Sequence, residues 1–327
     1  MSNPTPAPRT LTHALVACAI GACLSTASAQ DAGAPADAAA VKESASIPLH
    51  GAALFGRDAA MLALVFRPPG PGPFPVVVFS HGRSGERSSR ESLKQGIGRE
   101  QLRYWLDRGD AVVAPIRPGY GETGGSDVEH QSFRFDGVGL CRGSTDYVHL
   151  ADIVSRTVVA TLDWLKAQPW ADTQHVLLAG LSYGGFTTVA AGALPLPGVV
   201  GYVNYAGGAG GDPKDSPAHS CHPDEVTEVF AKLGKTTTVP NLWIYARNDE
   251  YWGPDVPAAW HAAFAAGGSR TTFVLAPPVD DGKGHTLANH SPTLWAPAVD
   301  AFLATIAFPG AASSGASAAP AAAPVAR

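Results

Sequence analysis

The stretch LLAGLSYGGFTT, residues 177–188, places a serine between glycines directly after a run of apolar residues. Its centre, GLSYG at 180–184, fits the pattern G-x-S-x-G, in which a strand turns sharply into a helix and exposes the serine hydroxyl. Glycine is needed on both sides because a Cβ there would collide with neighbouring backbone. We therefore expect Ser182 to be a nucleophile, held in a strained backbone conformation at the end of a strand.

The sequence around this turn alternates short apolar runs, rich in β-branched residues, with longer helical patterns. Such alternation is typical of the α/β class, in which helices flank a mostly parallel sheet. The expected strands lie within residues 75–82, 110–121, 175–180, 199–208, 240–250 and 270–278. Parallel sheets bind ligands at the carboxyl ends of their strands, so we expect the chemistry just after these runs.

The segment 146–168 has the clearest helical pattern. Its apolar residues recur at spacings of three and four and form one face: Leu150, Val154, Val158, Leu162 and Leu165. Thr145 is placed to cap the amino end of this helix, and Pro169 to end it. Further helices are expected within residues 183–194, 256–268 and 290–307.

The charge of the chain argues against one class of partner. The 327 residues carry a formal net charge of −5, and Lys and Arg are scattered along the sequence. Phosphate backbones and anionic membrane surfaces attract proteins that carry a basic stripe. We therefore expect no nucleic-acid partner.

Residues 1–29 have the features of a signal peptide. One positive charge precedes the apolar stretch 11–27, which is too short and too interrupted to span a bilayer stably, and small residues lead up to Ala29. Cleavage after Ala29 would export the chain to the periplasm or the medium. The alternative is lipoprotein processing at Cys18 or Cys23, but apolar residues follow Cys18 where a polar tether is expected.

The rest of the chain has three expected parts. Residues 30–45 are rich in Ala, Asp and Pro, show no periodic apolar face, and are predicted to form a flexible leader. Residues 46–308 are predicted to form one domain. Residues 309–327, rich in Ala, Pro and Ser, are predicted to be a disordered tail.

Two cysteines remain after cleavage at Ala29, namely Cys141 and Cys221. Exported chains rarely keep free thiols, so an even number favours a disulfide between them, with two independent thiols as the alternative. The bridge would pin residues 208–239, an excursion rich in glycine, proline and charge, to the loop around Cys141. We expect this excursion to be a short cap that shapes one wall of a pocket.

A serine hydroxyl needs a base to take its proton, and the base needs an acid to hold its tautomer. Asp249 lies at the end of the expected strand 240–250, and His285 lies in the glycine-bracketed loop 281–287 after the last strand. The chain order Ser182, Asp249, His285 is the order in which the acid and the base follow a serine of the G-x-S-x-G turn. We predict that these side chains converge.

Other residues compete for the two partner roles. Glu250 is the alternative acid, and Asp249 is favoured because it follows the strand more closely. Among the histidines, His290 stands where the closing helix begins, and His261 falls inside a helical pattern. We therefore expect His290 to lie at a helix start or at the surface and His261 to pack within a helix, and neither to act as the base.

The oxyanion that forms during attack on a carbonyl needs two backbone donors. In FSHGRSG, residues 79–85, a glycine permits a turn after the strand, so that the amide of Arg83 can face the site. The amide of Tyr183 is the second expected donor. Tyr251 and Trp252, directly beyond the acid, are expected either to line the pocket or to pack near it.

Taken together, the motifs resemble those of α/β-hydrolases. They are HGRSG, RPGYGETGG, GLSYGG, YARNDE and GKGHTL, in this order and with similar spacing. Over roughly residues 47–307 the chain is most similar to the dienelactone hydrolase-like branch, with some likeness to the prolyl oligopeptidase branch. The resemblance implies the α/β-hydrolase fold with an eight-stranded sheet. It also implies that Ser182, Asp249 and His285 act as nucleophile, acid and base.

One departure from that branch bears on the substrate. Dienelactone hydrolases use a cysteine nucleophile, so a serine here argues against a dienelactone substrate. We therefore expect an exported serine hydrolase that cleaves small carboxylic esters, with no cofactor and no metal. The segment 219–225, HSCHPDE, has metal-ligand residue types but no second matching cluster.

Other functions fit the same residues. A prolyl oligopeptidase-like peptidase or an acyltransferase would use the same nucleophile and base. A non-catalytic binding protein on a hydrolase fold is the alternative from another class. The oligomeric state and the acyl and alcohol groups of the substrate stay open at this stage.

Overall fold

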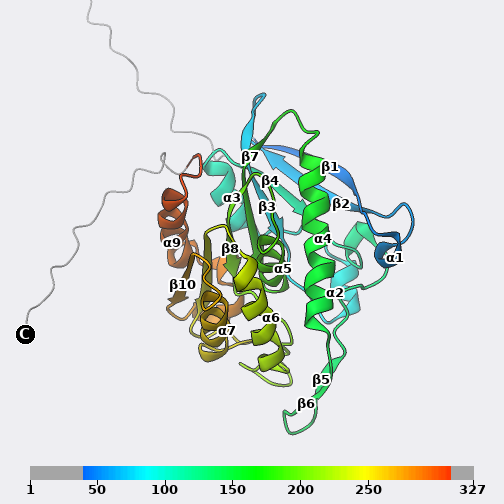
Figure 1. The fold of residues 1–327 in the computed structure, drawn as a ribbon, viewed down its shortest axis with the longest axis vertical. Helices are drawn as coiled ribbons and strands as arrows, with labels where there is room; N and C mark the ends of the chain where they lie inside the picture. Colours follow the sequence, from blue (N-terminus) through cyan, green and yellow to red (C-terminus); the bar gives the residue numbers. More distant parts are fainter. Residues whose placement is uncertain (1–39, 311–327) are drawn as a thin grey trace, which may run out of the picture. The chain divides into compact units, whose positions relative to one another are not determined.

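The computed structural model describes residues 40–310 (Figure 1). The expected signal peptide, residues 30–39 of the expected leader and residues 311–327 of the expected tail lie outside the described residues. Between residues 40 and 310, no helix combines the length and the apolar character that crossing a membrane requires.

The centre of the fold is an eight-stranded sheet with the strand order β1-β2-β4-β3-β7-β8-β9-β10. Its strands are β1 (Val41–Pro48), β2 (Ala60–Arg67), β3 (Phe74–Ser80), β4 (Ala111–Pro115), β7 (Ala171–Leu181), β8 (Val199–Tyr205), β9 (Asn241–Ala246) and β10 (Thr271–Ala276). β2 pairs antiparallel with both of its neighbours, and all other pairs are parallel. The mostly parallel α/β sheet expected from the sequence is confirmed.

The central strands are the apolar runs that the sequence analysis identified. All residues of β4 and β9 are buried, as expected for strands that are covered on both faces. Because β3, β7, β8 and β9 are parallel neighbours, their carboxyl ends share one edge of the sheet. The segments that follow these ends are the ones expected to carry chemistry.

β1 corrects the prediction that residues 30–45 form a flexible leader, because the strand begins at Val41. It pairs with β2 along its whole length, from Val41 opposite Arg67 to Pro48 opposite Ala60. Ile47 is fully buried, whereas residues 42–44 are exposed. An edge strand with one solvated side needs few apolar residues, so its composition resembles that of a linker.

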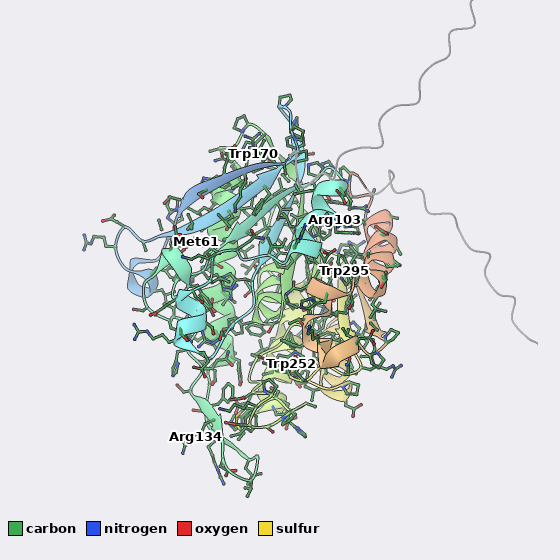
Figure 2. The ribbon with its side chains drawn as sticks, turned by 180° about the vertical axis from the view of Figure 1, so that it is seen from behind. Met61, Arg103, Arg134, Trp170, Trp252 and Trp295 are labelled. Carbon is green, nitrogen blue, oxygen red and sulfur yellow. A yellow bond between two sulfur atoms is a disulfide. The ribbon has the colours of Figure 1, made fainter. Side chains whose placement is uncertain are left out.

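Helices cover both faces of the sheet. The helices α4 (Tyr147–Leu165), α5 (Tyr183–Gly192), α6 (Pro223–Thr236) and α7 (Asp255–Ala265) lie on one face (Figure 1). The helices α3 (Arg99–Asp107), α8 (Leu287–His290) and α9 (Pro292–Thr305) lie on the other, which faces the viewer in Figure 2. Trp295 of α9 packs edge-on against Tyr205 of β8, and Phe230 of α6 packs edge-on against Trp243 of β9. Aromatic side chains thus pack between the sheet and the helices on both faces.

α4 confirms the helix expected at 146–168, with its apolar face buried. Its cap differs from the expectation. The carboxylate of Asp146, and not Thr145, accepts a hydrogen bond from the backbone N–H of His149 at 2.9 Å. The helix starts one residue later than expected, so Asp146 is the residue whose side chain reaches the free amide of the first turn.

The expected cap at 208–239 is also corrected. Residues 223–236 form α6, which packs against α7 and the sheet with Phe230 fully buried. Neighbouring parallel strands need a crossover, and α6 supplies the one between β8 and β9. Its apolar residues follow helical spacing, and the glycine and proline before them obscured this pattern. Only residues 208–222 form a loop beside the site.

Candidate active site

Ser182 lies at the turn between β7 and α5. Its backbone has φ 59° and ψ −125°, a region that residues other than glycine rarely occupy. Its backbone N–H donates to the carbonyl of Tyr205 on the neighbouring strand at 2.9 Å. The strained conformation that the sequence predicted is therefore confirmed, at the carboxyl end of a central strand.

The glycines around Ser182 allow a close approach of backbone segments. A Cβ on Gly180 would overlap the backbone carbonyl of Gly184, and a Cβ on Gly184 would overlap the carbonyl of Ser80 at the end of β3. The serine turn and the loop that follows β3 are therefore in direct contact. Any larger residue at these positions would push the two segments apart.

Ser182, His285 and Asp249 form one hydrogen-bonded line. Nε2 of His285 lies 2.8 Å from Oγ of Ser182, and Nδ1 lies 3.0 and 3.1 Å from the two carboxylate oxygens of Asp249. His285 is 4% exposed and Asp249 is 1% exposed. Such a line can take the proton of a serine hydroxyl and stabilise the imidazolium that results.

Backbone amides hold the carboxylate of Asp249 in place. The N–H groups of Tyr251 and Trp252 donate to its Oδ1 at 2.8 and 3.2 Å. Glu250, the alternative acid, instead accepts a hydrogen bond from the backbone N–H of His285 at 3.0 Å. The imidazole therefore faces Asp249, and Glu250 fixes the loop that carries the imidazole. Sequence reasoning did not identify this second contact.

The competing histidines belong to helices. His290 is an exposed residue at the end of α8. His261 on α7 shares a hydrogen bond with the Thr271 hydroxyl at 2.9 Å and stacks on Phe273. Both are placed as helix residues, in agreement with the sequence analysis.

Two aromatic residues surround the imidazole of His285. The ring of Tyr251 stacks on it, with centroids 3.9 Å apart and planes inclined by 27°. Trp252 meets the same ring edge-on at 5.5 Å and is 2% exposed. The indole N–H of Trp252 donates to the carbonyl of Ala206 at 2.9 Å. Tyr251 is thus partly open to the pocket, whereas Trp252 is mainly packed.

The serine opens into a cavity of about 660 Å³. Residues of the stretches 83–86, 130–133 and 208–215 contribute to its walls, together with Ser182, Tyr183, Tyr251 and Trp252. Charged side chains such as Glu86, Asp212 and Lys214 border it, so its mouth is polar. A cavity of this size fits a small ligand.

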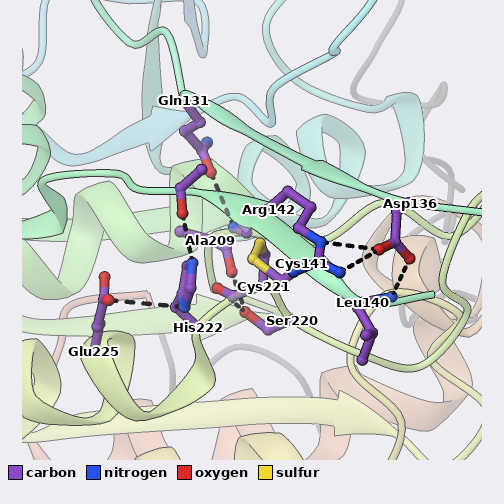
Figure 3. Close-up of a disulfide and its surroundings, with 12 residues drawn as sticks. Gln131, Asp136, Leu140, Cys141, Arg142, Ala209, Ser220, Cys221, His222 and Glu225 are labelled. Atoms are coloured by element: carbon purple, nitrogen blue, oxygen red, sulfur yellow. Dashed lines mark hydrogen bonds and ion pairs between the residues drawn. A yellow bond between two sulfur atoms is a disulfide. The ribbon is translucent and has the colours of Figure 1, made fainter. Parts of the chain in front are cut away.

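Cys141 and Cys221 form a disulfide, as the sequence predicted, with Cα atoms 5.2 Å apart (Figure 3). Cys141 begins β6 (Cys141–Gly143), which pairs with β5 (Phe133–Phe135) in a small hairpin. Cys221 lies near the end of the loop 208–222. Since both segments contribute to the cavity, the bridge ties two of its walls together.

Hydrogen bonds join the same two segments. The side-chain oxygen of Gln131 accepts from the backbone N–H of Gly210 at 2.9 Å. Nε2 of His222 lies 2.8 Å from the carbonyl oxygen of Gly143. Figure 2 places Arg134 of the hairpin at the same end of the fold as Trp252. The disulfide is therefore one of several contacts that hold this end of the fold.

The disulfide also bears on metal binding. Cys141, Cys221 and His222 place ligand-type atoms within 4.8 Å of one another. The two sulfurs are bonded to each other, so neither is the thiolate that a metal would need. In this oxidised form the cluster lacks the donors of a zinc site.

The loop after β3 carries the expected oxyanion donor Arg83. Gly82 lies against the serine, since a Cβ built on it would be 3.8 Å from Oγ of Ser182. Arg83 and Tyr183 both border the cavity. The guanidinium of Arg83 forms a two-pronged ion pair with Asp127 at 2.7 and 2.8 Å. Its side chain is thus held to one side of the loop.

A buried ion pair between Arg117 and Glu129 lies behind this loop, and both side chains are 1% exposed. Burial disfavours the charged guanidinium, but Glu129 and Tyr120 attract it, and the pKa of Arg117 is raised. Burial, together with Arg117, lowers the pKa of His81 well below its ordinary value, so this imidazole is neutral. In the sequence, Arg117 stands out only as the first residue of the motif RPGYGETGG. The signal available was a charged residue directly after a fully buried strand.

Comparison with known proteins identifies one family model and several solved structures that resemble this chain. The model of the X-Pro dipeptidyl-peptidase (S15) family matches residues 58–212, just under half of the chain. This segment contains the loop after β3 and the serine turn. No curated protein sequence matches the chain.

Several solved structures share the fold. A candidate dienelactone hydrolase of Klebsiella pneumoniae is 18% identical, with a TM-score of 0.52 over 82% of this chain and 99% of that one. The Pyrococcus furiosus esterase Pf2001 is 14% identical, with a TM-score of 0.54 over 84% and 95%. The Pyrococcus horikoshii acylaminoacyl peptidase is 13% identical, with a TM-score of 0.54 over 84% of this chain but 43% of that chain.

These neighbours agree with the topology described above. An eight-stranded, mostly parallel sheet with helices on both faces and a G-x-S-x-G turn after a central strand is the arrangement expected from the sequence motifs. The chain is therefore an α/β-hydrolase-fold protein.

Proposed function

We propose that this chain is an exported serine hydrolase that cleaves carboxylic esters through an acyl-serine intermediate. The observation that carries the proposal is the hydrogen-bonded line from Ser182 through His285 to the buried Asp249. The serine end of this line borders a cavity large enough for a small ester.

In the proposed reaction, Nε2 of His285 takes the proton of Ser182 as Oγ attacks the ester carbonyl. The backbone N–H groups of Arg83 and Tyr183 stabilise the negative oxygen that forms. Asp249 keeps the Nδ1 proton in place and stabilises the imidazolium. His285 then gives its proton to the leaving alcohol. In the second step it deprotonates a water molecule that attacks the acyl carbon, and it returns this proton to Oγ of Ser182 as the carboxylic acid leaves.

The neighbours support an ester substrate. The Pyrococcus furiosus esterase has nearly the same extent as this chain, since the match covers 95% of it. The Pyrococcus horikoshii acylaminoacyl peptidase is longer, and the match covers 43% of it.

Two observations support export. A disulfide joins Cys141 and Cys221, and structural disulfides persist in oxidising compartments. Residues 1–29 have the pattern of a signal peptide with cleavage after Ala29. Fractionation of cells that express the full chain tests this part, and finding the protein only in the cytoplasm would contradict it.

A fluorophosphonate probe and a series of p-nitrophenyl esters test the chemistry. Wild type should be labelled and should hydrolyse short esters, and Ser182→Ala should do neither. Ser155→Ala is the matched control, because this buried serine lies on α4 and bonds a backbone carbonyl outside the cavity. Equal labelling of wild type and Ser182→Ala would contradict the proposal.

A peptidase is the second candidate, because the model of the X-Pro dipeptidyl-peptidase family matches residues 58–212. The same serine and histidine can cleave an amide when the leaving amine is protonated. Ala-Pro-p-nitroanilide and p-nitrophenyl acetate, assayed side by side, separate the two functions. A kcat/KM for the peptide substrate above that for the ester would favour the peptidase.

A further inference from the structure

The expected oxyanion donor is the backbone N–H of Arg83. It belongs to a peptide group whose carbonyl, that of Gly82, accepts hydrogen bonds from two side chains. The peptide unit between Gly82 and Arg83 contains the Gly82 carbonyl and the Arg83 N–H, which lie in one plane and point in opposite directions. Any contact that fixes the carbonyl therefore fixes the direction of the N–H. The structure shows which side chains hold this carbonyl.

His81 and Arg117 supply the donors. Nδ1 of His81 lies 2.7 Å from the Gly82 oxygen, and Nη2 of Arg117 lies 3.4 Å from it. Nη1 of Arg117 also donates to the carbonyl of His81 at 2.7 Å. The backbone N–H of Arg117 donates to Nε2 of His81 at 3.1 Å, so the ring proton of neutral His81 resides on Nδ1 and is donated to Gly82. Two successive carbonyls of the loop are thus oriented by one arginine.

Arg117 is itself fixed by Glu129. Its Nε pairs with one carboxylate oxygen, and its Nη2 lies 3.3 Å from the other. The hydroxyl of Tyr120 donates to the same carboxylate at 3.0 Å. Arg117, Tyr120 and Glu129 are 0%, 2% and 1% exposed. A buried guanidinium is costly unless its donors are satisfied, so its position is closely determined by these partners.

The other end of the loop is held through the Arg83 side chain. Its guanidinium pairs with Asp127, which Arg90 also contacts at 3.2 Å. Asp127 and Glu129 are two residues apart, so one segment holds both Arg83 and Arg117. The peptide group between Gly82 and Arg83 is therefore anchored on both sides.

We propose that Arg117, backed by Glu129, is a positioning residue that aims the N–H of Arg83 at the oxygen of the reacting carbonyl. This inference rests on the proposed hydrolase function. The planar fork of arginine reaches two carbonyls and a carboxylate together, which the single ammonium of lysine cannot do. A purely structural ion pair would affect stability and leave transition-state stabilisation unchanged.

The test compares wild type with Arg117→Lys and Arg117→Met. The assays are kcat and KM for p-nitrophenyl acetate, and inhibition by an aryl trifluoromethyl ketone, whose adduct with a serine places a negative oxygen in the oxyanion site. We expect kcat to fall by about 10- to 100-fold in Arg117→Lys and further in Arg117→Met, with KM within about threefold. The inhibition constant of the ketone should rise by a similar factor.

Arg108→Met is the matched control. Arg108 also has a buried guanidinium, which pairs at 2.6 Å with the partly exposed Asp300, but this pair joins the end of α3 to α9 and involves neither the loop nor the serine. This variant should lower the melting temperature without changing kcat or ketone inhibition. All assays are run below the melting temperature of the least stable variant.

Tyr120→Phe is the second variant, in case the Arg117 variants do not fold. It removes the hydroxyl that donates to Glu129 and keeps the ring. We expect a fall in kcat of about two- to fivefold, with parallel weakening of the ketone. Unchanged kcat and ketone inhibition in folded variants would overturn the inference. Hydrolysis that survives in Ser182→Ala would overturn the proposed function instead.

Discussion

The inner side and the outer walls of the cavity are built in different ways. On the inner side, Ser182 follows β7 and Asp249 follows β9 within three residues, and both strands lie inside the sheet. The outer walls come from residues 130–133, which lead into the two-stranded hairpin, and from residues 208–215 of the loop 208–222. A disulfide and scattered hydrogen bonds connect these walls.

This difference separates the two tasks of the site. Sheet hydrogen bonds and buried ion pairs hold the groups proposed to act on the reacting atoms. The outer walls are less buried, and Val138 and Leu140 at the hairpin tip are 80% and 54% exposed. We therefore expect changes on the inner side to alter the chemical step, and changes in the outer walls to alter substrate selection and stability.

His285→Ala gives the largest expected effect on the inner side. Loss of the proposed base should lower kcat for p-nitrophenyl acetate by about 10⁴-fold or more, because among residues 40–310 His285 is the side chain that shares a hydrogen bond with Oγ of Ser182. His290→Ala, which changes an exposed histidine five positions along the chain, should retain full activity. Comparable losses in both variants would contradict the assignment of the base.

The double variant Cys141→Ser, Cys221→Ser tests the outer walls. The free energy of unfolding, measured in urea, should fall by about 2–4 kcal/mol because the unfolded chain loses a cross-link. KM for bulky esters should rise several-fold, while kcat for the acetate ester stays within about threefold. Wild type with a reductant should behave like the double variant. A kcat loss above tenfold would show that the walls and the chemical step are coupled.

Asp110→Asn tests stability at the opposite end of the sheet, where β4 begins. Neither carboxylate oxygen of Asp110 has a hydrogen-bond partner within residues 40–310, and burial, opposed by Arg108, raises its pKa to about 8. The folded state therefore holds a proton that the unfolded state loses near the ordinary aspartate pKa of 3.8, and stability falls as pH rises from about 4 to about 8.

Asparagine removes this pH dependence. Asp110→Asn should be more stable than wild type by about 5 kcal/mol at pH 8, because each unit of pKa shift corresponds to about 1.4 kcal/mol, and the advantage should vanish near pH 4. Thermal unfolding across this range measures the difference, and kcat should not change. An advantage that is the same at every pH would contradict the assigned ionisation.

Tyr251 gives the smallest expected effect, since it touches the base and also borders the cavity. Tyr251→Leu removes the ring that stacks on His285 and should lower kcat by about three- to tenfold through a less well-placed imidazole. Tyr251→Phe keeps the stacked ring and loses only the hydroxyl. Its kcat should stay within about twofold of the wild-type value. Equal losses in both variants would assign the effect to the hydroxyl.

Much of the inner side could be predicted because its signals are local. The glycines around Ser182, the acid directly after a buried strand and the glycine-bracketed loop of His285 each appear within a few residues. The disulfide followed from a count of two cysteines. The serine turn and the positions of the acid and the base depend on local backbone geometry and on strand order, and short sequence motifs are enough to predict both.

Other features left weak local signals. The first residues of β1 resemble a leader in composition, because an edge strand with one solvated side needs few apolar residues. The glycine and proline that precede α6 predict a cap over this segment, whereas Phe230 of the helix is buried in the core. Glu250 was identified as a rival acid, while its contact with the backbone of His285 became visible only in three dimensions.

The sequence by itself determined the strand-to-helix turn at Ser182, the buried strands and the chain order of the relay, since these depend on residue type and on neighbours along the chain. The tertiary structure alone decided that Arg117 and Glu129 meet behind the loop of Arg83 and that two outer segments share a cavity wall. Contacts between distant segments depend on how the sheet twists and how its connections pack, and no short stretch of sequence encodes that geometry.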